Sequence, residues 1–390
     1  GSAAAAALPD PPAEAMECSR AVSRRIRSEI AAAGGWIAFD RYMDLALYTP
    51  GIGYYSGGAA KFGAAGDFVT APELSPLFAQ TIAAQVAEIL THSAPEIIEV
   101  GAGSGRRAAD LLLELERRRA LPAHYAILDL SGELRARQRA TLDRDAPHLL
   151  PRVRWLDRLP QRVDGLLLAN EVLDALPVHL VRWQGSEIRE RGVSLADGQL
   201  VWSERPARGS LLDRARTLGE ECAIAPGYLS EIALIAPAWV AQWAGILGRG
   251  VLLLIDYGFP RHEYYHAQRD TGTLMCHYRH RAHGEPFHLP GLQDITAHVD
   301  FTAIVEAAVE AGLELLGYTT QSTFLFNCGL TEILARTSAS DPQRYLPLAN
   351  AAQKLISPAE MGELFKVLAL GKRYSERLIG FANGDRSATL

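Results

Sequence analysis

Short apolar runs alternate with amphipathic segments through the middle of the chain. The apolar runs predict buried strands and the amphipathic segments predict helices. In order, the pattern predicts strand 97–100, helix 106–118, strand 125–129, helix 133–142, strand 153–156 and strand 164–169. This alternation is typical of an α/β fold, in which helical crossovers connect the strands of a parallel sheet.

The flanking regions follow other patterns. An amphipathic helix is expected over 18–33, before Gly34 and Gly35, and loops with short strands are expected over 36–72, which is rich in Gly, Tyr and Pro. The remaining predicted elements are helix 74–90, hairpin strands 178–183, 187–193 and 199–202, helix 230–247, strand 251–255, helix 302–311, strands 313–318 and 322–327, and mostly helices after residue 330.

These elements suggest a division of the chain into four parts. They are a disordered leader or cloning remnant over 1–17, a helical and loop cap over 18–90, a core over 91–330 with an insertion at about 178–247, and a helical region over 331–390. The sequence leaves open whether the protein forms a homodimer.

Composition and charge restrict the function classes. The chain has 390 residues, of which 48% are hydrophobic and 22% charged, and its formal net charge is −6. A general nucleic-acid binder would carry a basic face, and no apolar run is long enough to span a membrane. We therefore expect neither nucleic acid nor membrane as a partner.

Cysteine and histidine spacing gives little support to a metal site. Four cysteines lie far apart without a paired motif, which fits a reducing compartment. His277, His280 and His283 recur at three-residue intervals, but no acid lies at ligand spacing and Gly and Pro surround them. We expect no metal, and a loop that lines a polar pocket instead. The composition favours a bacterial cytoplasm, with the mitochondrial matrix as the eukaryotic alternative.

The most informative motif follows the first predicted strand of the core. Glu99 ends the strand, and Gly101, Gly103 and Gly105 follow at alternate positions. Glycines allow a tight strand-to-helix turn and the close approach of a ligand. A dinucleotide fingerprint requires a small residue where Arg106 stands, whereas this spacing resembles the S-adenosylmethionine site of Rossmann-like methyltransferases. A tight turn without a ligand is the alternative.

A second acid follows the next strand. Asp129 comes directly after the predicted strand and could accept hydrogen bonds from both ribose hydroxyls of a bound nucleoside. Alternatively, Asp129 or Ser131 caps the helix that follows.

Polar residues also follow the strand at 164–169. Asn170, Glu171 and Asp174 would lie at the carboxyl edge of the sheet, where ligands bind in open α/β folds. Two carboxylates one helical turn apart share a face and could clamp a guanidinium group. The alternative is that they are ordinary acids at a helix N-terminus.

Further candidates for a substrate pocket lie downstream. Asp256 follows the strand at 251–255 and either holds substrate or satisfies backbone donors. The pocket candidates are Asp256, Tyr257, His283, Asp294 and Thr296, and Asp300 is expected to cap the helix that follows it.

With these motifs, the chain resembles the MidA-type methyltransferases, a family that includes the mitochondrial complex I assembly-factor methyltransferase and bacterial relatives. The resemblance rests on eight blocks: Phe39–Met43, Gly51–Tyr55, Gly66–Ser75, Glu99–Gly105, Asn170–Val178, Asp256–Gly258, Asp294–Phe301 and Met361–Lys366.

The resemblance implies a seven-stranded Rossmann-like sheet with added elements that build a substrate groove. It implies a protein arginine methyltransferase that uses S-adenosylmethionine, releases S-adenosylhomocysteine and makes symmetric dimethylarginine on a complex I subunit. The glycines would cradle the methionine part of the cofactor, Asp129 would hold its ribose, and Glu171 and Asp174 would face the acceptor. Gly66, Asp67 and Thr70 would form part of a lid. The chain departs from the family pattern at Ala102, where proline is usual, and at Asp129, where glutamate is usual.

Two other classes remain open. One is a non-catalytic assembly factor that binds the cofactor as a structural ligand, and the other is a nicotinamide-dependent oxidoreductase, which Arg106 disfavours.

Overall fold

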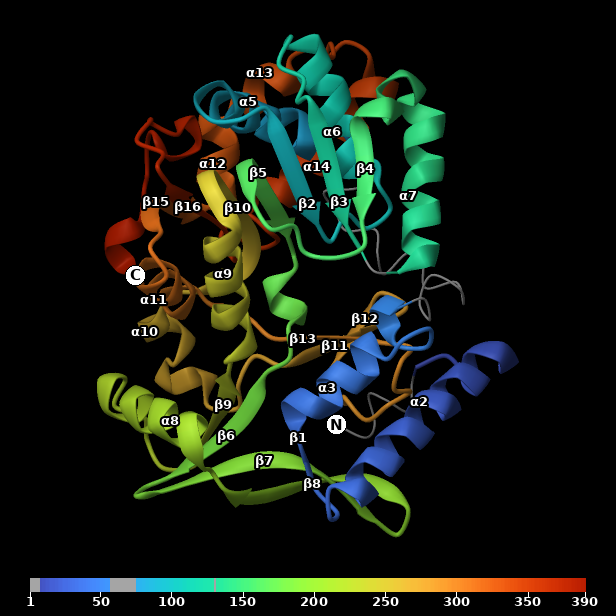
Figure 1. The fold of residues 1–390 in the computed structure, drawn as a ribbon, viewed down its shortest axis with the longest axis vertical. Coiled ribbons are helices and arrows are strands. Elements are labelled where there is room, and N and C mark those ends of the chain that lie inside the picture. The colour runs from blue at the N-terminus through green and yellow to red at the C-terminus, as the bar shows by residue number, and fades with distance from the viewer. Residues whose placement is uncertain (1–7, 57–74, 130) are drawn as a thin grey trace. The chain divides into compact units, whose positions relative to one another are not determined.

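The computed structural model describes residues 8–56, 75–129 and 131–390 (Figure 1). These residues cluster into two compact units. The hairpin unit comprises the described residues of 8–56, 173–238 and 259–300, and the sheet unit comprises those of 75–172, 239–258 and 301–390. The predicted lid residues Gly66, Asp67 and Thr70 lie outside the described residues.

The sheet unit is built on one mixed sheet whose path runs through seven strands, β15–β16–β10–β5–β2–β3–β4. Their bounds are β2 Glu96–Val100, β3 His124–Leu128, β4 Val153–Leu156, β5 Val163–Asn170, β10 Leu247–Phe259, β15 Glu314–Thr320 and β16 Phe365–Lys372. Strands β2 to β5 and β10 pair in parallel, and β16 runs antiparallel to both of its neighbours. The predicted α/β fold with a seven-stranded Rossmann-like sheet is confirmed.

The order of the strands locates the expected binding edge. From β2 the chain builds outward through β3 and β4, then returns to add β5 and β10 on the other side of β2. The topological switch point therefore lies between β2 and β5, and open α/β sheets bind ligands beyond the carboxyl ends of the strands at this point.

Alternating side chains of the central strands pack into a large core. Ile97, Leu166, Leu168 and Val251 belong to one buried cluster with helices α5 and α6. The helices of this unit are α5 Leu77–His92, α6 Arg106–Arg117, α7 Gly132–Asp145, α11 Phe301–Glu310, α12 Gln321–Asn327, α13 Leu330–Leu334 and α14 Pro342–Ile356, with 3₁₀ turns at Pro147–Arg152, Ile379–Phe381 and Ser387–Thr389. Helix α9, Ile235–Ile246, spans the boundary of the two units.

Two C-terminal elements differ from the prediction. Strand β16 lies in the region that the sequence predicts to be mostly helical. It was not predicted because it is buried on both faces, and its apolar run therefore shows none of the alternation that marks a strand. Residues 322–327 form helix α12 rather than the predicted strand. The Thr320 hydroxyl accepts a hydrogen bond from the Thr323 backbone N–H and so caps this helix.

The hairpin unit contains two smaller sheets. One runs β1–β7–β6–β9, with β8 paired to β7, and the other runs β12–β11–β13. Their strands are β1 Ile37–Ala38, β6 His179–Gln184, β7 Glu187–Ala196, β8 Gln199–Pro206, β9 Tyr228–Ile232, β11 Met275–Tyr278, β12 Arg281–His283 and β13 Asp294–Thr296. Asp197 and Gly198 both have positive φ, which matches the twist of a two-residue hairpin turn. The predicted hairpin strands are confirmed.

The helices of the hairpin unit correct three expectations. They are α2 Ala13–Ala32, α3 Phe39–Tyr48, α8 Gly209–Glu221 and α10 Arg261–Tyr264, with 3₁₀ turns at Tyr54–Ser56, Leu173–Ala175 and Ala267–Arg269 and a short strand β14 at Val299–Asp300. Helix α2 starts after Pro12, inside the predicted disordered leader, and its first turn is closed by the Met16 N–H, which donates to the Pro12 carbonyl at 3.0 Å. Helix α3 replaces predicted loops and buries Phe39, Tyr42 and Met43. The predicted helix 230–247 is partly strand β9, and α8 was not predicted.

Candidate active site

The three glycines of the motif connect β2 to α6 through a left-handed turn. Gly101, Gly103 and Gly105 have φ values of 70°, 55° and 87°. A Cβ on Gly105 would lie 2.9 Å from the Cα of Gln138 in α7, and one on Gly101 would lie 2.8 Å from Cγ2 of Val172. Backbone conformation and close packing therefore require glycine at these two positions, beyond any ligand the loop accommodates.

Glu99 is engaged in a buried network beneath this loop. Its side chain is fully buried and accepts hydrogen bonds from Arg107 Nε and the Tyr125 hydroxyl, each at 2.8 Å. Arg107 Nη2 also donates to the Gly101 carbonyl at 3.1 Å. The structure thus gives Glu99, a predicted cofactor residue, an internal partner at each oxygen, and it ties the end of β2 to the start of α6.

Asp129 lies at the end of β3 as predicted, and its carboxylate is held from two sides. The Ser131 backbone N–H donates to Oδ1 and the Gln138 side chain donates to Oδ2, each at 3.0 Å. Burial raises the pKa of Asp129, against the lowering effect of these two bonds. The cap of α7 is Ser131, whose hydroxyl accepts from the Leu134 N–H. The helix-cap alternative therefore belongs to Ser131 rather than to Asp129.

Asn170 and Glu171 lie at the carboxyl end of β5, beside the glycine loop. Asn170 is 5% exposed, and among the described residues no hydrogen-bond donor reaches its buried Oδ1. The next two residues remain close to the sheet, since the Glu171 N–H donates to the Ile255 carbonyl at 2.8 Å and Val172 packs at Gly101. A buried acceptor at this edge thus has no donor in the described part of the chain, and burying such an acceptor is costly unless a ligand or another group donates to it.

Glu171 has an unusual backbone. Its φ is 54°, in the left-handed region that non-glycine residues rarely adopt, and strain of this kind is often found at functional sites. The 3₁₀ turn that follows begins only at Leu173. The prediction that Glu171 and Asp174 share the face of one helix is therefore wrong, because Glu171 has no helical conformation.

Asp256 and Tyr257 extend the same edge from β10. Asp256 is 1% exposed and accepts the Tyr257 N–H at 2.9 Å. In the antiparallel pairing with β16, Asp256 lies opposite Lys366 and Tyr257 opposite Phe365. Of the two alternatives for Asp256, the satisfaction of a backbone donor is observed.

The other candidates lie in the hairpin unit, where two aromatic residues accompany them. The Tyr55 hydroxyl lies 2.8 Å from both carboxylate oxygens of Asp294, and the Tyr48 hydroxyl donates to the Ala175 carbonyl at 2.6 Å. The Ala297 N–H donates to the Asp174 carbonyl at 3.0 Å, and the two tyrosine rings stack. Burial, then the charges of Asp294 and Asp174, raise the pKa of both tyrosines well above its usual range.

Asp174 and Asp294 thus surround the same tyrosine pair. Sequence reasoning assigned roles to the two acids but not to Tyr48 and Tyr55, although Gly51–Tyr55 was among the family blocks. Asp300 directly precedes α11, as expected.

Thr296 and His283 lie on the three-stranded sheet of the same unit. Thr296 Oγ1 donates to the Met275 carbonyl, and His283 Nδ1 accepts the Glu285 N–H, at 3.5 and 3.1 Å. His283 pairs with Cys276 across β11 and β12, and His280 occupies the turn between these strands with a φ of 64°. The histidine repeat thus follows a hairpin, and the described residues contain no group of three or more His, Cys, Asp or Glu arranged to hold a metal ion.

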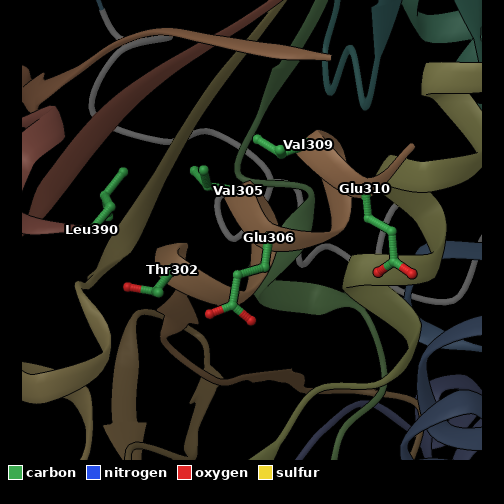
Figure 2. A pocket seen from close by; sticks show the side chains of 6 residues that line it. All are labelled: Thr302, Val305, Glu306, Val309, Glu310 and Leu390. Carbon is green, nitrogen blue, oxygen red and sulfur yellow. The ribbon is translucent and has the colours of Figure 1, made fainter. Parts of the chain in front are cut away.

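One surface hollow in the sheet unit lies on helix α11 (Figure 2). It has a volume of about 410 Å³ and is lined by Thr302, Val305, Glu306, Val309, Glu310 and Leu390. None of the predicted site residues lines it. Nowhere in the described part of the chain is a helix both long and apolar enough to cross a membrane.

Comparison with known proteins identifies the family. Residues 79–319 match the family described as "Putative S-adenosyl-L-methionine-dependent methyltransferase". The chain is 28% identical to "Protein arginine methyltransferase NDUFAF7, mitochondrial" of Danio rerio, over 90% of this chain and 87% of that protein. The Mus musculus protein of the same name is 29% identical over 86% and 81%.

One similar protein has been solved with a bound cofactor product. A Burkholderia thailandensis protein crystallised with S-adenosyl-homocysteine is 55% identical, with a TM-score of 0.94 over 98% of this chain and 100% of that chain. The residues of the sheet unit fit such a ligand, since the glycine turn, the held Asp129 carboxylate and the Asn170 Oδ1, which has no donor among the described residues, all lie at the carboxyl edge of the sheet. The chain belongs to the family of S-adenosylmethionine-dependent methyltransferases.

Proposed function

We propose that this enzyme is a protein arginine methyltransferase that makes symmetric dimethylarginine on a subunit of respiratory complex I. The support is the name shared by relatives 28–29% identical over most of their length, together with the pair of acids that follows β5. A protein substrate, a bacterial cytoplasmic location and the complex I link belong to this proposal.

The sheet unit would hold the cofactor. Gly101, Gly103 and Gly105 would face its methionine part, and Asp129 would accept the ribose hydroxyls, since an ionised carboxylate only accepts hydrogen bonds and can accept two at once. S-adenosylmethionine supplies an activated methyl group on a good leaving group. The protein therefore needs to align the acceptor and exclude water rather than to activate the donor.

The observation that carries the acceptor role is the pair Asn170 and Glu171. One presents a buried carbonyl oxygen without a donor among the described residues, and the other is held in a left-handed conformation beside it. A carboxylate there would bind the N–H groups of a guanidinium and orient one nitrogen, since paired hydrogen bonds between arginine and carboxylate fix direction as well as distance. Such a carboxylate favours the cation, so it positions the nitrogen rather than deprotonating it. Asp174, three residues further along the chain, is the second candidate acid.

Transfer of label tests the proposal. Purified enzyme and radiolabelled S-adenosylmethionine are added to a lysate of cells that lack this gene, and labelled bands are hydrolysed in acid. Label in symmetric dimethylarginine on one protein is the expected result. Label in another amino acid would overturn the arginine assignment. Tight cofactor binding without any transfer would favour the assembly-factor alternative.

A further inference from the structure

Gln138 connects two parts of the cofactor site that lie far apart in the sequence. Its side chain is fully buried, and Nε2 donates to the Gly103 carbonyl at 3.1 Å and to Asp129 Oδ2 at 3.0 Å. One amide group of α7 therefore joins the glycine loop after β2 to the acid after β3. No sequence motif pointed to this residue.

The orientation of this amide is determined by a third partner. Trp155 Nε1 donates to Gln138 Oε1 at 2.9 Å. An indole nitrogen can only donate, so the amide oxygen must face Trp155 and the NH₂ group must face the loop and the acid. The two hydrogens of the NH₂ group are both used, one for the Gly103 carbonyl and one for Asp129. Trp155 is itself held in place, since the guanidinium of Arg139 packs on its ring, 4.4 Å from the ring centre.

These contacts restrain the Asp129 carboxylate at both oxygens. Ser131 N–H holds Oδ1 and Gln138 holds Oδ2, so rotation of the carboxylate would break one bond or the other. Each carboxylate oxygen has a second lone pair that is still available, and the two restraints fix the direction of each of these lone pairs. A preorganised acceptor of this kind binds hydroxyl donors with less loss of freedom than a rotating one.

We propose that Gln138 is a positioning residue that sets the selectivity of the cofactor site for ribose hydroxyls, through its simultaneous bonds to Asp129 and Gly103. This inference rests on the proposed role of Asp129 as the ribose acceptor. Trp155 acts one step further out, by keeping the amide in the orientation that donates to both partners.

A structural role alone would give a different pattern of binding. A variant that merely loosens α7 weakens every ligand of the site by a similar factor. A variant that releases the Asp129 carboxylate weakens a ligand with both hydroxyls more than a ligand that lacks one of them, because the first ligand loses two restrained bonds and the second loses one. The ratio of the two affinities, rather than either affinity alone, therefore separates the two roles.

Calorimetric binding of S-adenosylhomocysteine and of its 2′-deoxy and 3′-deoxy forms to the full chain tests this inference. The wild-type protein should bind the deoxy forms roughly 10- to 100-fold more weakly, the range for hydrogen bonds to a charged group. In Gln138→Leu this preference should fall to about threefold or less. Trp155→Phe, which keeps an aromatic ring but removes the indole N–H, should give an intermediate preference and decides the question if Gln138→Leu does not fold.

Gln321 offers a matched control. It is a fully buried glutamine of the same unit whose Nε2 donates to the Leu355 carbonyl at 2.9 Å, away from the glycine loop. Gln321→Leu should keep the wild-type preference. A wild-type preference that survives in Gln138→Leu and Trp155→Phe would overturn the inference alone. Equal binding of all three ligands by the wild-type protein would refute the role of Asp129, and the inference with it.

Discussion

Arg107 Nε donates to Glu99 at 2.8 Å, and the two side chains are 3% and 0% exposed. The acid one residue before the end of β2 is thus paired with a base on the first turn of α6, and the same guanidinium donates to the Gly101 carbonyl. Arg107 therefore connects the start of the glycine turn to its end, and these bonds hold the turn in place before any ligand binds.

Removing one partner of this pair should destabilise the protein strongly. We expect Arg107→Met to lower the free energy of unfolding by about 3–5 kcal/mol, because it leaves a buried carboxylate without its counter-charge. Arg162→Met is the control, since Arg162 pairs with Asp164 at 3.0 Å with side chains 63% and 32% exposed and should cost less than about 1 kcal/mol. Urea denaturation measures both. Equally small losses of unfolding free energy in the two variants would show that the buried pair contributes no more to stability than the exposed pair.

Gly105 should be intolerant of a methyl group. Gly105→Ala is expected to cost about 1 kcal/mol for its positive φ and a further 1–3 kcal/mol for the overlap with the backbone of Gln138. Gly198 has a φ of 74° with nothing within 4 Å of the added atom, so Gly198→Ala should show the first cost alone. Thermal unfolding of the two variants compares them, and an equal loss in both would argue against close packing of α7 on the loop.

The stability of the hairpin unit should depend on His179. Its ring lies 2.8 Å from Glu190 and 3.2 Å from Asp40. Burial by itself lowers the pKa of His179, but the bond to Glu190 and the two acidic charges raise it overall above its usual 6.5. Burial also raises the pKa of Asp40, which the charge of His179 opposes.

The sign of the pH dependence follows from the raised pKa. The folded protein holds the histidine proton more tightly than the unfolded chain, so this stabilisation is complete below pH 6.5 and is lost as the pH rises through the folded-state pKa. The difference in unfolding free energy between the wild-type protein and His179→Gln should therefore shrink as the pH rises above 6.5. A difference that is constant from pH 5 to about 9, or that grows with pH, would contradict this account.

Much of the sheet unit could be predicted because its signals are local. Apolar runs predicted β2, β3, β5 and β10. Glu99 and Asn170 in the last two positions of β2 and β5, and Asp129 directly after β3, lie at the carboxyl ends of these strands as expected. Gln138 could not be predicted, because its importance comes from the packing of α7 on the glycine loop rather than from any neighbour in the sequence. The contact between Tyr55 and Asp294 could not be predicted for the same reason, since the two residues are 239 positions apart, although Asp294 itself was a pocket candidate.

Other elements were missed for a different reason. The centre of β16, Val367–Leu370, is apolar without alternation, and a strand buried on both faces has the same composition as a buried helix segment. The left-handed Glu171 also has no sequence signal, because a glutamate gives no indication of positive φ. The prediction that Glu171 and Asp174 share one face of a helix was wrong because of this left-handed conformation of Glu171.

A pair of measurements on Glu171→Gln tests directly whether Glu171 orients an arginine acceptor. We expect its dissociation constant for S-adenosylhomocysteine to stay within about twofold of wild type, while methyl transfer into arginine falls about 100-fold or more. This split would follow because the amide keeps the shape of the side chain but loses the charge that orients a guanidinium. Unchanged transfer with unchanged binding would show that Glu171 does not orient the acceptor.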